Sequence, residues 1–266
     1  MNLFVIMTVF ATILTFWLGS STERIAVRYL ARMAAICFGS VLALPAAAYA
    51  AYYTRLLGEP VWLYDIRSIP FSELASSGAG FLAGFCQSAI VHSESLRRRV
   101  GVVALPAALG LLVLLPHLKP LLRRPKWDQF ADRWADGVCL QSSPSSCGPA
   151  CGATLLRYLN KPATELEIAR EAFTSSSGTE NWYLARALRR RGVSVQFLAQ
   201  PTNNDVMPFP AIAGVRVEGA GHFITILGRE GEKWVIGDPL VGRQFLTFAQ
   251  FQNSYQPTGF FMLVKK

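Results

Sequence analysis

The sequence predicts a chain in two parts, with a bundle of about four transmembrane helices over residues 1–118 and an α+β domain over residues 137–266. The first observation is composition. The 266 residues are 52% hydrophobic and only 16% charged, and their mean hydropathy of +0.30 is high for a soluble protein. The second is the distribution of charge, because residues 1–118 hold 8 of the 26 basic and 5 of the 17 acidic residues.

Four uncharged stretches of the first part are candidates to cross a bilayer, whose hydrocarbon core of about 30 Å needs roughly 20 apolar residues. Met1–Thr22 lacks the basic start and the small-residue cleavage motif of a signal peptide, so we predict that it is a first span. Met33–Thr54 and Val100–Leu118 are the second and fourth. Leu74–Ser93 is rich in Gly, Ser and Ala, so a re-entrant segment is its alternative, and three spans are the fallback.

Residues 119–136 link the two parts. Aromatic and aliphatic residues are interspersed there with lysines and arginines, which predicts an amphipathic stretch lying at the membrane interface. A plain helix that packs on the domain is an equal alternative.

The domain over residues 137–266 is predicted as α+β because helical patterns come first and strand patterns follow. A capping-box pattern begins at Thr164, and the three arginines before Gly192 are expected to form a solvated helix end. The predicted helices are Pro149–Leu159, Thr164–Ala172, Glu180–Arg191 and the short Phe248–Tyr255. The predicted strands are Ser194–Ala199, Ala211–Val217, His222–Leu227, Lys233–Ile236, Gln244–Leu246 and Phe260–Val264.

Cys147 lies where a loop enters the first of these helices. Ser145 or Ser146 is expected to cap the helix, and Pro149 suits its first turn. The positive end of the helix dipole favours the thiolate, which is the nucleophilic form of cysteine. Gln141, six residues upstream, is close enough to turn its amide towards the same point as an oxyanion donor.

A thiolate nucleophile needs a base, and the base needs an orienting group. Of the three histidines, His92 and His117 lie in or beside apolar N-terminal segments, which leaves His222 at the start of a predicted strand. Asp238 follows the next strand in a Gly-Asp-Pro turn, so two adjacent antiparallel strands place it beside His222. The alternatives are a plain strand histidine and a turn-forming aspartate.

These residues, in this order, resemble the C39 family of cysteine peptidases, papain-like domains best known for cutting leader peptides after a double glycine. The matching segments are Gln141 with Cys147-Gly148-Pro149-Ala150, then Gly221-His222-Phe223, then Gly237-Asp238-Pro239. The resemblance covers roughly residues 137–264. Many members carry an aspartate directly before the cysteine, whereas this chain has Ser146, and a further Cys151 follows one helical turn later.

The resemblance implies a papain-like fold and thiol proteolysis without a metal or other cofactor. Cys147 would attack the peptide carbonyl, His222 would move the proton, Asp238 would orient the imidazole, and Gln141 would hold the oxyanion. The implied substrate is a peptide with a small, Gly-Gly type cleavage site. No GxxxxGK[ST] phosphate loop is present, so a transporter partner would be a separate chain and residues 1–118 an anchor in the lipid bilayer.

Two other classes of function remain open: a non-proteolytic module that binds leader peptides, and a papain-like acyl transferase. Cys139 and Cys151 are expected to be structural, a Cys147–Cys151 redox pair is the less favoured alternative, and a zinc site lacks paired CxxC spacing. The net charge of +9 suits anionic lipid or acidic peptides. It does not indicate nucleic acid, because no aromatic-interleaved basic stripe accompanies it.

The expected location is the cell membrane, with several spans. Six arginines in the loops of one side face seven basic residues on the other, so the positive-inside rule does not decide the orientation. Free cysteines and the usual placement of C39 domains slightly favour a cytoplasmic domain. Arginine-rich first and third loops favour the opposite.

Overall fold

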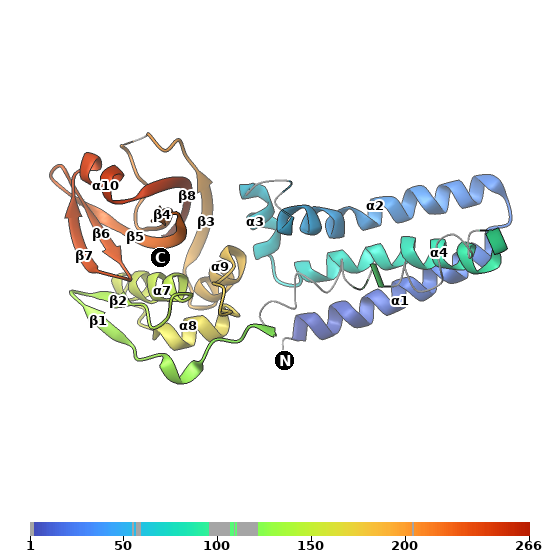
Figure 1. Ribbon diagram of the computed structural model, residues 1–266, viewed down its shortest axis with the longest axis horizontal. Coiled ribbons are helices and arrows are strands. Elements are labelled where there is room, and N and C mark those ends of the chain that lie inside the picture. The colour runs from blue at the N-terminus through green and yellow to red at the C-terminus, as the bar shows by residue number, and fades with distance from the viewer. Residues whose placement is uncertain are drawn as a thin grey trace. The chain divides into compact units, whose positions relative to one another are not determined.

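The computed structural model describes residues 3–54, 56, 60–95, 107–108, 110, 122–203 and 205–266. The chain forms two compact units (Figure 1). The first is Met1–Pro60 with Ile69–Leu122, and the second is Val61–Ser68 with Arg123–Lys266. The predicted span Val100–Leu118 lies outside the described residues except for positions 107, 108 and 110.

Among the described residues, three helical segments of the first unit are long and apolar enough to cross a membrane. They are α1 (Leu3–Ile25), α2 (Tyr29–Tyr53) and the continuous pair of the 3-10 helix η1 (Ser72–Gly78) and α4 (Ala79–His92). The third segment has 21 residues, which is long enough for a full crossing, and the re-entrant alternative stays open.

α1 and α4 run side by side in the same direction. A Cβ added at Gly84 would lie 1.9 Å from the carbonyl oxygen of Phe16, so this glycine allows the two backbones to approach closely. Further along both helices, Ser88 Oγ of α4 donates a hydrogen bond of 2.8 Å to Glu23 Oε2 of α1. The close helix contact predicted from the glycines of this span is therefore present.

α2 runs in the opposite direction to η1 and α4. A Cβ added at Gly78 would lie 2.4 Å from the carbonyl oxygen of Leu42. The hydroxyl of Tyr49, later in α2, donates a hydrogen bond of 3.0 Å to the carbonyl oxygen of Ser72, earlier in η1. The end of α2 and the start of η1 thus lie at the same end of this unit.

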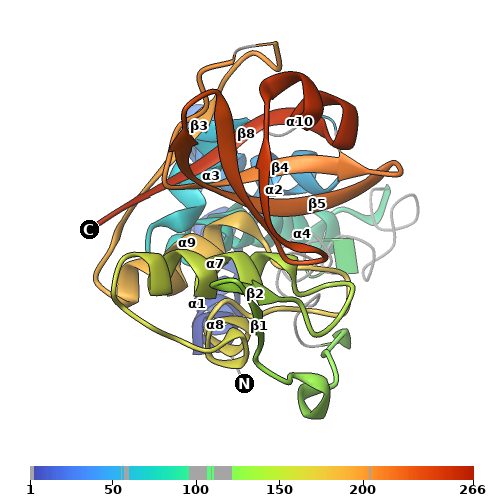
Figure 2. The same cartoon turned by 90° about the vertical axis from the view of Figure 1, so that its left-hand side faces the viewer.

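The second unit packs three helices on one side of a six-stranded antiparallel sheet (Figures 1 and 2). The helices are α7 (Cys147–Tyr158), α8 (Glu165–Glu171) and α9 (Asn181–Arg190). The sheet order is β3-β8-β4-β5-β6-β7, with β3 (Ser194–Ala199), β4 (Ala211–Val217), β5 (Ala220–Glu230), β6 (Lys233–Asp238), β7 (Gly242–Leu246) and β8 (Gln256–Lys265). This arrangement confirms the predicted α+β class.

Apolar residues of β4, β5, β6 and β8 form one hydrophobic core cluster together with Phe251 and Tyr255. Phe251 lies in the short helix α10 (Phe248–Ser254), whose capping box joins Thr247 and Gln250. β3 and β4 have the predicted bounds, and β5, β6, β7 and β8 lie where strands were predicted but are longer.

The described residues of the linker do not form the plain helix that was one of the two alternatives, and the amphipathic stretch at the membrane interface stays a prediction. A 3-10 turn, η2 (Trp127–Gln129), is followed by a hairpin of β1 (Arg133–Ala135) and β2 (Val138–Leu140). Trp134 of this hairpin contacts another residue of the second unit: the guanidinium of Arg157 lies 4.5 Å from the centre of its ring.

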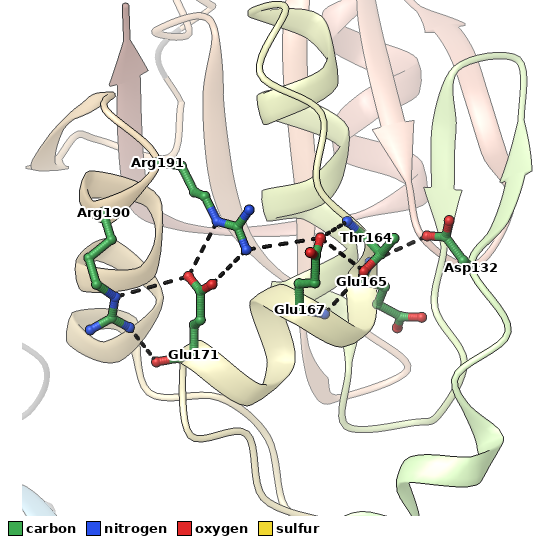
Figure 3. Close-up of polar contacts among 7 residues, drawn as sticks. All are labelled: Asp132, Thr164, Glu165, Glu167, Glu171, Arg190 and Arg191. Atoms are coloured by element: carbon green, nitrogen blue, oxygen red, sulfur yellow. Dashed lines mark hydrogen bonds and ion pairs between the residues drawn. The ribbon is translucent and has the colours of Figure 1, made fainter. Parts of the chain in front are cut away.

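α8 begins with the predicted capping box, in which Thr164 and Glu167 bond each other's backbone N–H groups (Figure 3). The arginines at the end of α9 are not simply solvated, contrary to the sequence prediction. Arg191 forms an ion pair of 2.5 Å with Glu171 Oε1, and Arg190 donates to the Glu171 carbonyl oxygen at 2.7 Å (Figure 3). These contacts tie the end of α9 to the end of α8.

Candidate active site

Cys147 is the first residue of α7 and is half-buried. The preceding serines do not cap this helix through their side chains, contrary to the prediction. Ser146 Oγ instead accepts from the Ser143 N–H and contacts the Ser143 carbonyl oxygen, both at 3.0 Å, which folds the loop tightly before the cysteine. The first N–H groups of an α-helix have no partner within the helix. The N–H groups around Cys147 can therefore face a substrate oxygen.

Cys151 fixes α7 against the sheet. It is fully buried, and its Sγ donates a hydrogen bond of 3.3 Å to the carbonyl oxygen of Phe223, the residue after His222. Burial, followed by the charge of Cys147, raises the pKa of the Cys151 thiol well above its usual value. Cys151 therefore stays a neutral donor that sets the distance between α7 and β5.

His222 and Asp238 form a buried pair between adjacent strands. Antiparallel pairing of β5 with β6 places Thr225 opposite Gly237, so the two functional side chains lie just beyond the end of this ladder. His222 Nε2 lies 2.8 Å from Asp238 Oδ1. The side chains are 7% and 3% exposed, so little water competes for this bond. Asp238 Oδ1 accepts the hydrogen bond from His222 Nε2, which leaves Nδ1 of the imidazole for Cys147.

The electrostatics of the pair favour a charged imidazole. Burial of the ring lowers the pKa of His222, but hydrogen bonds to Asp238 and to Cys147 outweigh it and raise the pKa to about 9. Burial also raises the pKa of Asp238, yet hydrogen bonds from His222, Tyr255 and the Leu240 N–H bring it below its usual value. A protonated His222 between two acceptors is therefore the stable form at neutral pH.

Tyr255 is a member of this network that the sequence reasoning did not identify. Its hydroxyl donates a hydrogen bond of 2.7 Å to Asp238 Oδ2, and the side-chain amide oxygen of Gln244 lies 3.0 Å from the same hydroxyl. The Leu240 N–H donates to Asp238 Oδ1 at 2.8 Å. Both carboxylate oxygens are thus held, which fixes the face that Asp238 presents to His222. Tyr255 follows a short helix, and no local pattern marks it as functional.

Gln141 lies in the loop before Cys147 and is joined to the loop after Asp238. Its backbone N–H donates a hydrogen bond of 2.9 Å to the carbonyl oxygen of Pro239. Its side-chain Nε2 donates to the Ser143 carbonyl oxygen at 2.9 Å, while Oε1 is buried without a hydrogen-bond partner. An amide nitrogen carries two hydrogens, so one remains for an oxyanion.

A buried carboxylate holds the loop that carries Gln141. Glu165, the first residue of α8, is fully buried. Its Oε1 accepts from the Ser142 N–H at 2.9 Å, and its Oε2 accepts a short hydrogen bond from Ser142 Oγ. Asp132 Oδ1 in turn accepts from the Glu165 N–H at 3.4 Å (Figure 3). The helix α8 thereby positions the loop between Gln141 and Cys147.

Cys139 is buried beneath α7, and its N–H donates to Thr154 Oγ1 at 2.9 Å. Burial, followed by the charge of Glu165, raises the pKa of its thiol, so it remains neutral. In the part of the chain that the structure describes, no group of three or more His, Cys, Asp and Glu side chains has a metal-binding arrangement. The arrangement of Cys147, His222 and Asp238 instead suits nucleophilic chemistry.

A family model, the peptidase C39 family, matches residues 136–266. An uncharacterised protein of Methanothermobacter marburgensis is 35% identical over 106 residues, which cover 40% of this chain and 73% of that protein. An uncharacterised protein of Methanothermobacter thermautotrophicus is 32% identical over 111 residues, again 40% of this chain and 73% of that protein.

Two solved structures are also similar to this chain. A double glycine motif protease from an AMS/PCAT transporter, solved with the leader peptide, has 23% identity and a TM-score of 0.42, covering 48% of this chain and 89% of that one. The peptidase domain of Streptococcus ComA, a bi-functional ABC transporter, has 19% identity and a TM-score of 0.41, covering 47% and 95%.

Proposed function

Because residues 136–266 of this chain belong to the peptidase C39 family, we propose that the chain is a membrane-anchored cysteine endopeptidase that cleaves a peptide or leader sequence. The single observation that carries the chemistry is the bond of 2.8 Å between the buried His222 and Asp238 side chains, beside a half-buried Cys147. A histidine held in this way, with its second nitrogen towards a thiol, is the arrangement that activates cysteine as a nucleophile.

The reaction follows from these positions. The Cys147 thiolate attacks the peptide carbonyl carbon, and the negative oxygen that forms is held by the Cys147 N–H and the Gln141 amide. The His222 imidazolium gives its proton to the leaving amine, which frees the new N-terminus and leaves an acyl-enzyme. His222 then takes a proton from water, whose oxygen attacks the thioester and releases the new carboxyl end. Asp238 and Tyr255 keep the ring in place through both steps.

The proposed cleavage site contains small residues of the Gly-Gly type, on the strength of the family alone. Three apolar helices of the first unit support an anchor in the membrane. A separate transporter chain is a further proposed partner.

A binding module without catalysis explains less of the site. Binding a peptide needs neither a thiol at a helix N-terminus nor a buried His–Asp pair. Burying the two ionisable side chains costs free energy, and catalysis gives a reason for that cost whereas binding does not. Acyl transfer uses the same residues as hydrolysis and differs only in the acceptor that attacks the acyl-enzyme.

The test is cleavage of synthetic leader-type peptides by the full chain in detergent. We expect mass spectrometry to show hydrolysis after the second glycine of a Gly-Gly peptide and little cleavage of a matched peptide with two valines there. Added glycinamide separates the two chemistries: an amide product in place of the free acid would show an acyl transferase. Binding of both peptides without any product, with Cys147 intact, would contradict the peptidase and support a binding module.

The pH dependence of kcat/KM is expected to show an alkaline limb near pH 9. His222 is protonated below its raised pKa of about 9, so the ion pair and the proton for the leaving amine are lost as the pH rises through that value. The charged imidazole also stabilises the folded domain, and this contribution is lost as the pH rises from about 6.5 to about 9.

In Asp238→Asn the imidazolium of His222 loses the carboxylate that raises its pKa. The alkaline limb should therefore move towards about pH 6.5, the ordinary pKa of histidine. At pH 8 we expect a decrease of kcat/KM of about 30-fold, because about nine tenths of the imidazole is charged at a pKa of about 9 and only about 3% at a pKa of about 6.5. Tyr255→Phe, which keeps the bond between His222 and Asp238, is the matched control and should shift the limb less. An alkaline limb at the same pH in wild type and Asp238→Asn would show that another group titrates.

A further inference from the structure

The segment between the second and third apolar spans is part of the peptidase unit. This segment forms α3 (Val61–Ser68), which the sequence analysis did not predict. Tyr64 is fully buried, and its ring centre lies 6.2 Å from that of Trp182 on α9 and 5.6 Å from that of Phe197 on β3. The Phe260 ring of β8 lies edge-on to it at 5.5 Å. An aromatic ring enclosed in this way belongs to a packed core.

Polar contacts fix the C-terminal end of α3 as well. The Arg67 guanidinium lies 4.8 Å from the centre of the Trp182 ring, and Arg67 is 1% exposed. Arg186 and Arg189, both on α9, donate hydrogen bonds to the last carbonyl groups of α3, those of Arg67 and Ser68. Arg189 also donates to Ser68 Oγ at 2.7 Å. Cations at these carbonyls satisfy groups that a helix leaves without partners.

The apolar spans before and after α3 show at which end of these helices α3 is connected. α3 follows the end of α2 and precedes the start of η1, and these two ends lie together, as the hydrogen bond between Tyr49 and Ser72 shows. His92, at the end of α4, lies at the opposite end of the helices, where its Nδ1 is 3.6 Å from Glu23 Oε2 near the end of α1. The chain therefore leaves α4 on the side away from α3.

We infer that the peptidase domain lies on the same side of the membrane as the loop that contains α3. α3 is covalently joined to the spans before and after it, and its Tyr64 ring is packed among rings of α9, β3 and β8. The loop and the domain must therefore lie on one side, opposite to the side on which the chain leaves α4.

This inference rests on the membrane anchoring in the proposed function and not on the peptidase chemistry. It places the start of α1, α3 and the peptidase domain on one side of the membrane, and the connection between α1 and α2 on the other. The domain is attached to the membrane region at two points, through α3 and through residue 123.

Labelling of single introduced cysteines with a membrane-impermeant maleimide in spheroplasts tests the inference on the full chain. The reporter sites are Ile66→Cys on α3, Lys233→Cys in the hairpin of β5 and β6, and Val27→Cys between α1 and α2. All three positions are exposed. The background replaces the exposed Cys37 and the half-buried Cys147 by serine. A permeant maleimide added to lysed membranes gives the full signal for each variant.

We expect Ile66→Cys and Lys233→Cys to give the same result in intact spheroplasts, both labelled or both protected, and Val27→Cys to give the opposite one. Opposite results for Ile66→Cys and Lys233→Cys would overturn the inference, and so would the same result for Val27→Cys and Lys233→Cys. Release of the wild-type chain by alkaline carbonate would instead contradict the membrane anchoring itself. None of these outcomes depends on whether the domain cleaves peptides.

Discussion

Replacing Cys147 by alanine is expected to abolish peptide cleavage and to remove the fast reaction of the protein with an iodoacetamide probe. Cys147 is half-buried at the start of α7, whereas Cys139 and Cys151 are fully buried. Only the thiolate reacts quickly, and the imidazolium of His222 stabilises it beside the helix N-terminus. Removing the nucleophile of the serine protease subtilisin costs about 10⁶-fold in kcat, and a loss of that order would put cleavage below detection here.

Labelling rates in isolated membranes separate this role from a structural one. His222→Ala should slow the labelling of Cys147 sharply, because the cation beside the thiolate is lost. Cys151→Ala is the matched control: it removes a thiol one helical turn away and the bond to the Phe223 carbonyl, but leaves the nucleophile. Labelling of Cys147 no faster than that of Cys139, or unchanged in His222→Ala, would contradict the peptidase and favour a module that only binds peptides.

The central part of the site could be predicted from sequence because local patterns carry it. Gly148 and Pro149 mark the helix start after Cys147, and the alternating residues after His222 mark its strand. The spacing between His222 and Asp238 matches two adjacent strands, and their side chains lie 2.8 Å apart as that pairing requires. The catalytic roles of these residues stay predictions until the variants are measured.

The supports of the site could not be predicted because they join segments far apart in the chain. Glu165 contacts Ser142 across 23 positions, and Tyr255 contacts Asp238 across 17. Neither has a spacing or pattern that distinguishes it from other residues of a helix start or a strand approach. The same reason explains the arginines of α9, whose partners Glu171 and Ser68 appear only once the chain is folded.

α3 is the clearest case of a tertiary contact that no local signal shows. Its sequence, VWLYDIRS, follows an apolar span, so its aromatic residues are equally typical of a membrane interface. Only the partners on α9, β3 and β8 show that Tyr64 belongs to the domain core. A reading from sequence thus assigns this segment to the membrane part, and the packing assigns it to the domain.

Tyr64→Ala is therefore expected to destabilise the peptidase domain by about 3–5 kcal/mol, the usual cost of removing a large aromatic side chain from a core. The residue lies more than 80 positions before Cys147 and in a different predicted part of the chain. With a urea dependence of about 1–3 kcal/mol per molar, the unfolding midpoint should fall by at least about 1 M. Ile66→Ala, at a 45% exposed position of the same helix, should change it little.

Thiol accessibility measures this unfolding in the full chain, because Cys139 and Cys151 are fully buried in the domain and lie outside the apolar spans. Pulsed labelling of these two thiols across a urea series in detergent reports the domain, provided that Cys37, Cys86 and Cys147 are replaced by serine in every variant. If α3 only lies on the surface, Tyr64→Ala and Ile66→Ala will give the same midpoint. A lower midpoint in Tyr64→Ala alone shows that the loop between two spans completes the core of the domain, since only then does its loss expose thiols so distant in sequence.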